Sequence, residues 1–375
     1  MNDPRPSPPT APARPVQLEA HGHVRTDPYY WLRERDDPEV LAYLEAENAY
    51  TEAMMAHTAE LQETLFQEIR GRIKQTDESA PYKRDDYYYY SRTEDGREYP
   101  IFCRKYAALD APEQVLLDGN VLAEGHGFFS VGSLAVSSGQ DILAYSVDTV
   151  GRRFYAIAFK DLSTGALLPD TIPDVTGNVA WAEDNRTLFY TQQDPTTLRA
   201  YRVYRHTLGA DPADDVLVYE EADETFSCYV GKTKSRRYML ISCYQTLSSE
   251  ARYLAADDPT GAFEVLLPRQ RDHEYDADHW GDHFYIRSNA NGAKNFCLRR
   301  APVDAVPTDV ALWETVIPHR EDVLLEGFAL LAGHLVAVER KNALIQMCVH
   351  PWASLDGVGS GEGAPDASPH YIDFG

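Results

Sequence analysis

The sequence lacks the short motifs that mark many enzyme active sites. No serine has one glycine two positions before it and another two positions after it, so the Gly-x-Ser-x-Gly turn that exposes a nucleophilic hydroxyl is absent. Ser163, for example, has Gly165 after it but Asp161 before it. Glycine-rich phosphate-binding sequences of the Walker or dinucleotide type are absent as well. We therefore predict no catalytic residue and no cofactor-binding residue in these 375 residues.

Closely spaced cysteines are missing too. The five cysteines form no Cys-x-x-Cys, which excludes a zinc knuckle and a redox pair, and they lie far apart, at Cys103, Cys228, Cys243, Cys297 and Cys348. Four of them lie in strand-like stretches, where buried free thiols are expected.

Positive charge and long hydrophobic runs are scarce. The 35 Lys and Arg residues are outnumbered by 59 Asp and Glu, which gives a formal net charge of −24. Nucleic acid and an anionic membrane surface both need a basic footprint, so we predict neither as a partner. The acidic charge either attracts cationic ligands or serves solubility alone. Residues 1–16 are rich in Pro and Ala without an apolar run of signal-peptide length, so we predict a cytoplasmic protein.

What the sequence does contain is a slow repeat between about Ala135 and Val349. In each repeat a turn-rich cluster precedes a short β-branched and aromatic run, and a second alternating run follows. Subtracting the residue numbers of one apolar anchor per repeat gives separations of 46, 50, 46 and 50, for Leu143, Phe189, Met239, Tyr285 and Leu335. A period of about 40–50 residues is typical of four-stranded propeller blades. We predict an all-β fold, a β-propeller; the alternative, a β-sandwich with irregular loops, has no reason to keep one period.

A short α-helical segment precedes the strands. Asp37-Pro38 supplies an N-cap and a first-position proline, and apolar residues then recur at spacings of three and four, with a break expected near His57. We divide the chain into a flexible Pro-rich N-terminus (1–25), a helical segment (26–78) and an incomplete β-propeller (79–375). The Gly-rich residues 357–363 are predicted to form a surface loop.

Two stretches suggest binding sites, and for each we favour a structural role. Tyrosines 87–90 could stack on bases, but the acidic balance argues against nucleic acid, so we place them in a hairpin at a blade edge. The cluster Asp272–His283 contains His273, His279 and His283 but lacks the His-Glu-x-x-His spacing, because position 277 is alanine. Alternate side chains of a strand point to opposite faces, so we predict no metal site there.

Several stretches together resemble the prolyl oligopeptidase family of serine peptidases, and within it the oligopeptidase B group. The first is Asp27-Pro28-Tyr29-Tyr30-Trp31-Leu32, followed by Pro38–Leu44 and Glu47-Asn48. Further similar stretches follow in the expected order: Ser79–Tyr82, Arg152-Arg153, Tyr219–Glu221, Pro268-Arg269, Asp272–Tyr275, Ile286–Asn289, Lys294–Phe296 and Leu325–Phe328.

The resemblance implies a seven-bladed propeller that caps a C-terminal α/β-hydrolase domain bearing Ser, Asp and His. It also implies that the intact enzyme cuts short peptides after Arg or Lys while the propeller limits substrates by size. We count about six blades, the first from about Pro81 and the last incomplete. We therefore expect the hydrolase domain to be missing, the helical segment to lack the surface that it covers, and the chain to be inactive alone. The implied partners are short basic peptides and that domain. The alternative is a non-catalytic propeller scaffold that binds peptides or proteins.

Overall fold

The computed structural model describes residues 6–355 and 368–374. The predicted surface loop at residues 357–363 lies outside the described residues. Contacts divide the chain into two compact units, Met1–Asp77 with Thr93–Gly96, and Glu78–Arg92 with Arg97–Gly375. Among the helices of the described residues, none is long and apolar enough to cross a membrane.

The first unit begins with a β-hairpin of β1 (Val16–Ala20) and β2 (His23–Asp27). Its two-residue turn, His21-Gly22, has φ values of 53° and 76°. Positive φ at both central positions matches the right-handed twist of the strands in a short hairpin. The segment up to residue 25, which we predicted to be flexible, thus contains most of a paired hairpin.

The helices of the first unit follow the predicted pattern. A 3-10 turn, η1 (Tyr30–Arg33), precedes α1 (Pro38–Met55), and the Asp37 carboxylate accepts a hydrogen bond of 2.8 Å from the amide of Glu39. A second 3-10 turn, η2 (Ala56–Thr58), interrupts the helix before α2 (Ala59–Gly71), which confirms the break predicted near His57. Large apolar side chains along α2 are exposed, namely Leu61, Leu65, Phe66 and Ile69.

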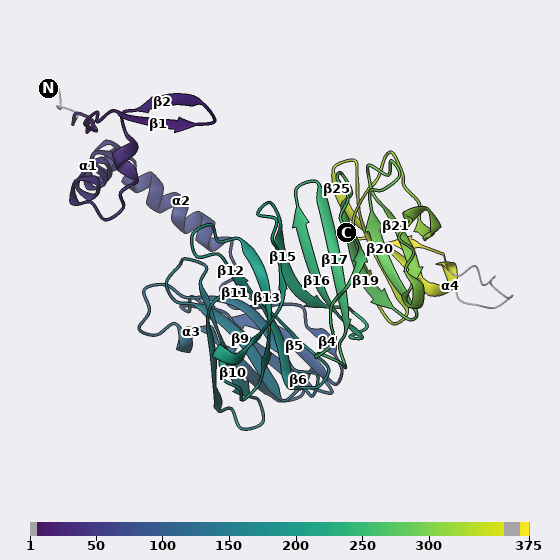
Figure 1. Ribbon diagram of the computed structural model, residues 1–375. Coiled ribbons are helices and arrows are strands. Elements are labelled where there is room, and N and C mark those ends of the chain that lie inside the picture. Colours follow the sequence, from purple (N-terminus) through teal and green to yellow (C-terminus); the bar gives the residue numbers. More distant parts are fainter. Residues whose placement is uncertain (1–5, 356–367, 375) are drawn as a thin grey trace. The chain divides into compact units, whose positions relative to one another are not determined.

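The second unit is built from antiparallel sheets (Figure 1), and apart from the first two strands of blade 1, which both pair with the third, the strands pair in sequence order. Blade 1 contains β3 (Asp77–Glu78), β4 (Tyr82–Arg84), β5 (Tyr87–Thr93), β6 (Ile101–Tyr106) and β7 (Glu113–Asp118). Blade 4 contains β15 (Ser227–Lys232), β16 (Tyr238–Gln245), β17 (Ser248–Ala255) and β18 (Glu264–Leu267). Blade 5 contains β19 (Tyr275–Trp280), β20 (His283–Ser288), β21 (Cys297–Pro302) and β22 (Glu314–Ile317). Blade 6 contains β23 (Leu324–Leu330), β24 (His334–Lys341), β25 (Leu344–Pro351) and the two-residue β26 (His370–Tyr371).

Blades 2 and 3 share one continuous sheet. Blade 2 contributes β8 (Ser130–Val136), β9 (Ile142–Asp148) and β10 (Tyr155–Asp161), and blade 3 contributes β12 (Thr187–Gln193), β13 (Ala200–Thr207) and β14 (Val216–Glu220). The 15-residue β11 (Leu167–Trp181) joins them, because its first half pairs with β10 and its second half with β12. The short helices α3 (Gly119–Leu122) and α4 (Trp352–Leu355) and the 3-10 turns η3 (Pro212–Asp214), η4 (Val303–Ala305) and η5 (Val310–Leu312) lie between strands.

The predicted repeat corresponds to the blades. All five apolar anchors lie on the second strand of their blades, namely β9, β12, β16, β20 and β24. The tyrosine run lies on β5 and forms the predicted hairpin with β6, but its placement at a blade edge is wrong. Because β3 and β4 both pair with β5, the run occupies an interior strand of the sheet.

The hydrophobic core lies between the blades. One cluster joins Phe189 and Val203 of blade 3 to Met239 and Ile241 of blade 4, all fully buried. Similar clusters join blades 1 and 2, blades 4 and 5, and blades 5 and 6. Each blade therefore depends on its neighbours for burial of its apolar side chains.

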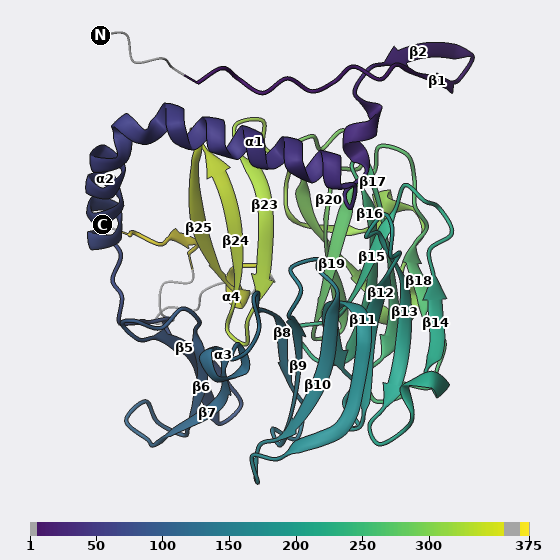
Figure 2. The same ribbon diagram turned by 90° about the vertical axis from the view of Figure 1, so that its left-hand side faces the viewer.

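The propeller has two ends with different connections, and Figure 2 shows the blades following one another around the unit. At the end that we call proximal, the chain passes from one blade to the next and from second to third strands. At the distal end it turns from first to second strands. First strands of consecutive blades touch, as β11 touches β15 and β19 touches β23, so we call them the inner strands.

Candidate functional site

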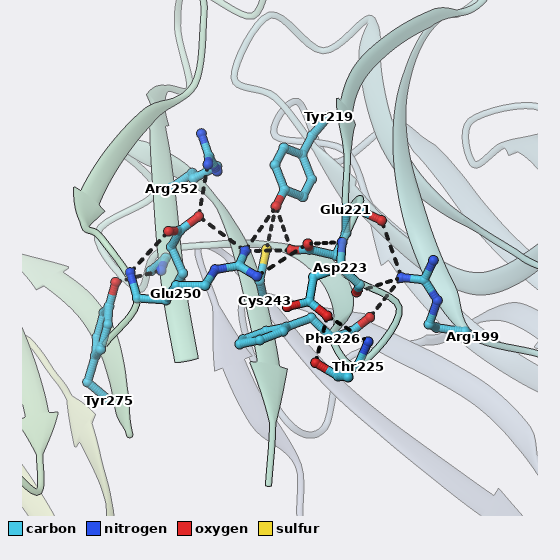
Figure 3. Close-up of polar contacts among 12 residues, drawn as sticks. Arg199, Tyr219, Glu221, Asp223, Thr225, Phe226, Cys243, Glu250, Arg252 and Tyr275 are labelled. Atoms are coloured by element: carbon cyan, nitrogen blue, oxygen red, sulfur yellow. Dashed lines mark hydrogen bonds and ion pairs between the residues drawn. The ribbon is translucent and has the colours of Figure 1, made fainter. Parts of the chain in front are cut away.

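The proximal end carries a buried network of ion pairs where blades 3, 4 and 5 meet (Figure 3). Arg269, from the connection between β18 and β19, binds the Glu221 carboxylate through both terminal nitrogens, at 2.6 and 3.3 Å. The Arg269 amide also donates to Glu250 of β17 at 3.1 Å. The Arg269 guanidinium lies 3.9 Å from the centre of the Phe226 ring. Arg269 thus ties its own connection, between β18 and β19, to the connection between β14 and β15 and to β17.

The charges in this network balance. Glu221 and Glu250 are opposed by Arg269 and Arg252, whose terminal nitrogen lies 2.8 Å from Glu250. Burial alone would raise the pKa of Glu221, but hydrogen bonds from Arg269, the Tyr219 hydroxyl and the Asp223 amide lower it overall. A carboxylate held ionised in this way is not a general acid at neutral pH. The hydrogen bonds of the network therefore hold backbone positions in this part of the propeller.

A second arginine holds the same connection from the other side. Arg199 donates to the carbonyl oxygens of Glu221, Asp223 and Phe226 at 3.3, 3.3 and 2.9 Å. The Asp223 carboxylate accepts hydrogen bonds from the amide and hydroxyl of Thr225. The connection between β14 and β15 is consequently fixed along its length, and its acidic residues Asp223 and Glu224 remain exposed at the proximal end.

The distal end has its own ion pair, between blades that are not neighbours. Arg236, in the turn before β16, binds Asp85, in the turn before β5, through two hydrogen bonds of 2.8 Å. Gln140 of blade 2 donates to the same carboxylate at 2.8 Å. All three residues have positive φ values of 54° to 65° in the corresponding turn of their blades. The turns of blades 1, 2 and 4 therefore meet at one point.

The histidines of the cluster at residues 272–283 do not come together. His273 Nε2 lies 2.8 Å from Ser288 Oγ, whereas His279 Nδ1 lies 2.8 Å from Ser235 Oγ of the neighbouring blade. His283 lies at the start of β20. No group of three His, Cys, Asp or Glu side chains suited to a metal ion occurs within the described residues.

The two Ser–His pairs are not activated nucleophiles. His279 is fully buried, and its Nε2 has no hydrogen-bond partner among the described residues, so no carboxylate orients the ring. Burial lowers the pKa of His279 to about 4. His273 is 4 % exposed, and its Nδ1 likewise has no partner among the residues described. The His273–Ser288 pair lies within blade 5, and the His279–Ser235 pair joins blades 5 and 4.

The cysteines are buried free thiols, as predicted. Burial raises the pKa of Cys103, Cys228 and Cys243 to about 12, so these thiols stay protonated and unreactive at neutral pH. The sequence did not reveal the Arg269 network or the Asp85–Arg236 pair. Their members are 48 and 151 residues apart, so only the fold brings them together.

The blades described above define a β-propeller, and comparison with known proteins identifies its kind. A family model described as the prolyl oligopeptidase N-terminal β-propeller domain matches residues 8–365. The chain belongs to this family.

Two curated relatives are similar over most of the chain. Dipeptidyl aminopeptidase BI of Pseudoxanthomonas mexicana is 45 % identical over 356 residues, covering 90 % of this chain and 49 % of the relative. Protease 2 of Moraxella lacunata is 33 % identical, covering 93 % of this chain and 50 % of the relative. The chain therefore spans about half the length of the curated relatives that it matches.

Solved structures show the same fold. Oligopeptidase B from Leishmania major superposes with a TM-score of 0.85 at 30 % identity, covering 92 % of this chain and 51 % of the other. Oligopeptidase B from Trypanosoma brucei gives a TM-score of 0.85 at 28 % identity, covering 98 % and 53 %.

Proposed function

We propose that this chain is the N-terminal propeller part of a cytoplasmic serine peptidase of the oligopeptidase B type, which hydrolyses short peptides after Arg or Lys. The observation that carries the proposal is the family match over residues 8–365 together with coverage of only about half of each peptidase relative. The other half of those relatives corresponds to nothing in this chain. A serine nucleophile, its base and an oxyanion hole would be supplied by a C-terminal hydrolase domain, the proposed partner of the propeller.

The charge of the chain supports the choice of substrate. A net charge of −24 creates a field that attracts peptides with basic side chains. Exposed carboxylates are held at the proximal end on the fixed connection that contains Asp223. We infer that a basic peptide approaches this end with little reorganisation of the protein.

The propeller would contribute selection by size. Its blades are joined by buried clusters, so they cannot separate without exposing apolar side chains. A wall of this kind admits an extended peptide and rejects a folded protein. The five buried free thiols agree with a reducing compartment such as the cytoplasm.

A second candidate activity comes from a relative. The protein from Pseudoxanthomonas mexicana, 45 % identical, is named a dipeptidyl aminopeptidase. A whole protein with this activity would remove dipeptides from the free amino terminus of a peptide, instead of cutting after Arg or Lys, and would use the same kind of propeller. A non-catalytic scaffold that binds peptides is the third candidate.

The test uses the product of the whole gene, including any coding sequence that follows codon 375. We expect that sequence to encode Gly-x-Ser-x-Gly, and the purified product to cleave fluorogenic peptides after Arg or Lys, with or without an acetylated amino terminus. The 375-residue chain alone is the control and should show no turnover. Cleavage confined to peptides with a free amino terminus would establish the dipeptidyl activity instead. Turnover by the control, or none by the whole product, would contradict the proposal.

Size selection needs a separate substrate pair. The same Arg-containing sequence is presented once as a free short peptide and once as a surface loop of a folded protein. We expect cleavage of the free peptide only. Equal cleavage of both would remove size selection from the proposed function.

A further inference from the structure

A cavity of about 320 Å³ lies between blade 1 and the first strand of blade 2, β8. Tyr82 and Arg84 of β4 form one wall, and Leu134 and Val136 of β8 form another. Its volume is at the lower end of the range for ligand-binding pockets, about 300–1,000 Å³. Neither the Arg269 network nor the Asp85–Arg236 pair includes any of these four residues.

The cavity suits a flat apolar group. The Tyr82 and Tyr89 rings stack with centres 5.5 Å apart and planes 18° apart. Tyr82 is 62 % exposed, whereas Leu116, which also lines the cavity, is 3 % exposed. An exposed aromatic face above an apolar floor offers stacking to an incoming ring.

The cavity also contains a guanidinium group without a hydrogen-bond partner among the described residues. Arg84 is the only charged side chain among the described residues that line it. No hydrogen bond or ion pair of Arg84 is found in the described part of the chain, although its charge helps to lower the pKa of the neighbouring Asp85 carboxyl. Nearby arginines differ, because Arg104 donates to Gln114 at 2.7 Å and Arg236 binds Asp85 at 2.8 Å.

We propose that this cavity binds the carboxyl-terminal residue of a peptide whose side chain is aromatic, with the ring against Tyr82 and the α-carboxylate on Arg84. The net charge of −24 repels the carboxylate of an approaching peptide. Binding of that carboxylate therefore needs a local positive charge such as the Arg84 guanidinium. A guanidinium and a carboxylate form paired, charge-assisted hydrogen bonds. The proposal rests on the proposed function in that it takes peptides as the ligands.

The experiment measures binding to the 375-residue chain, without hydrolysis. The probe is N-acetyl-glycyl-4-fluorophenylalanine, compared with its carboxyl-terminal amide by fluorine NMR titration. We expect the acid to bind at least tenfold more tightly than the amide. Arg84→Gln should remove this difference, and Tyr82→Ala should weaken both probes.

The matched control is Lys83→Gln. Lys83 neighbours Arg84 on β4, but its ammonium lies 5.7 Å from the centre of the Tyr88 ring and it does not line the cavity. This variant should leave both affinities unchanged. Arg84→Lys retains the charge and should keep part of the preference for the acid, which separates loss of charge from loss of folding.

Equal binding of acid and amide, no binding of either, or an Arg84→Gln protein that still prefers the acid would each overturn the proposal. Such a result leaves the peptidase proposal standing, because that proposal is tested by hydrolysis with the whole gene product. Conversely, the 375-residue chain could prefer the acid while the whole gene product shows no peptidase activity. The cavity would then be the ligand site of a propeller that binds peptides without cleaving them.

Discussion

At the scale of single residues, buried polar groups decide how this propeller responds to acid. His279 is fully buried between Tyr238 and Phe284, with one ring nitrogen on Ser235. The protonated ring would need a second acceptor, and the described residues offer none to Nε2. The neutral form is therefore favoured in the folded protein.

This arrangement predicts a loss of stability between pH 6.5 and about 4. The pKa of His279 is lowered from 6.5 to about 4, so in this range the unfolded chain binds a proton that the folded chain does not. Stability from this residue is present above pH 6.5 and falls as the pH drops towards 4, by up to about 3 kcal/mol. Urea denaturation of wild type and His279→Gln at pH 7 and pH 5 measures it. The variant should lose less stability than wild type, and His283→Gln serves as the control. Parallel losses in wild type and His279→Gln would refute the prediction.

At the scale of elements, the strands were predictable and several of their connections were not. The repeat anchored at Leu143, Phe189, Met239, Tyr285 and Leu335 located the second strand of five blades, because a buried position on that strand demands an apolar residue in every blade. The continuous β11 was not predicted, because a repeat of one anchor per blade does not show that a single strand can serve two blades. Tyr87–Tyr90 was placed at an edge because the sequence does not show that the two short strands before it, β3 and β4, pair with β5.

The connection between β14 and β15 gives the prediction at this scale. Arg269→Met leaves Glu221, which is 3 % exposed, without its counter-ion and removes the cation above Phe226. Removing one partner of a buried ion pair costs roughly 3–5 kcal/mol, and we expect about 3 kcal/mol because the Arg269 side chain is 26 % exposed. Arg271→Met is the matched control, because that side chain is 91 % exposed and its pair with Asp272 measures 3.7 Å.

Equilibrium unfolding in urea checks both variants. Hydrogen exchange should also show faster exchange at the amide of Asp223, which donates to Glu221 at 3.0 Å in wild type. A loss in Arg269→Met no larger than in Arg271→Met would show that the network does not fix this connection.

At the scale of the whole molecule, the sequence was more informative about the family than about the site. Resembling stretches such as Tyr219–Glu221 and Pro268-Arg269 occur in family order, and the match over residues 8–365 confirms the family. The same residues gave no hint that Glu221 and Arg269 bind each other, because spacing along the chain does not encode contacts between blades. The sequence did not indicate a binding role for Arg84 either. A single arginine on a strand suggests a binding site only when the structure shows which side chains surround it.

The net charge of −24 leads to the last prediction, which concerns how fast basic peptides associate with the chain. A field from many carboxylates raises the association rate of cations by roughly 10- to 1,000-fold at low salt. The field reaches about 30 Å at 0.01 M salt but only about 8 Å at 0.15 M. Stopped-flow fluorescence with a dye-labelled tri-arginine peptide should therefore show an association rate that falls at least tenfold over this range. A tri-glutamate peptide should show the opposite trend, and a tri-serine peptide should show none. A flat rate for the arginine peptide would mean that the acidity serves solubility alone, and the proposed preference for basic substrates would lose its electrostatic support.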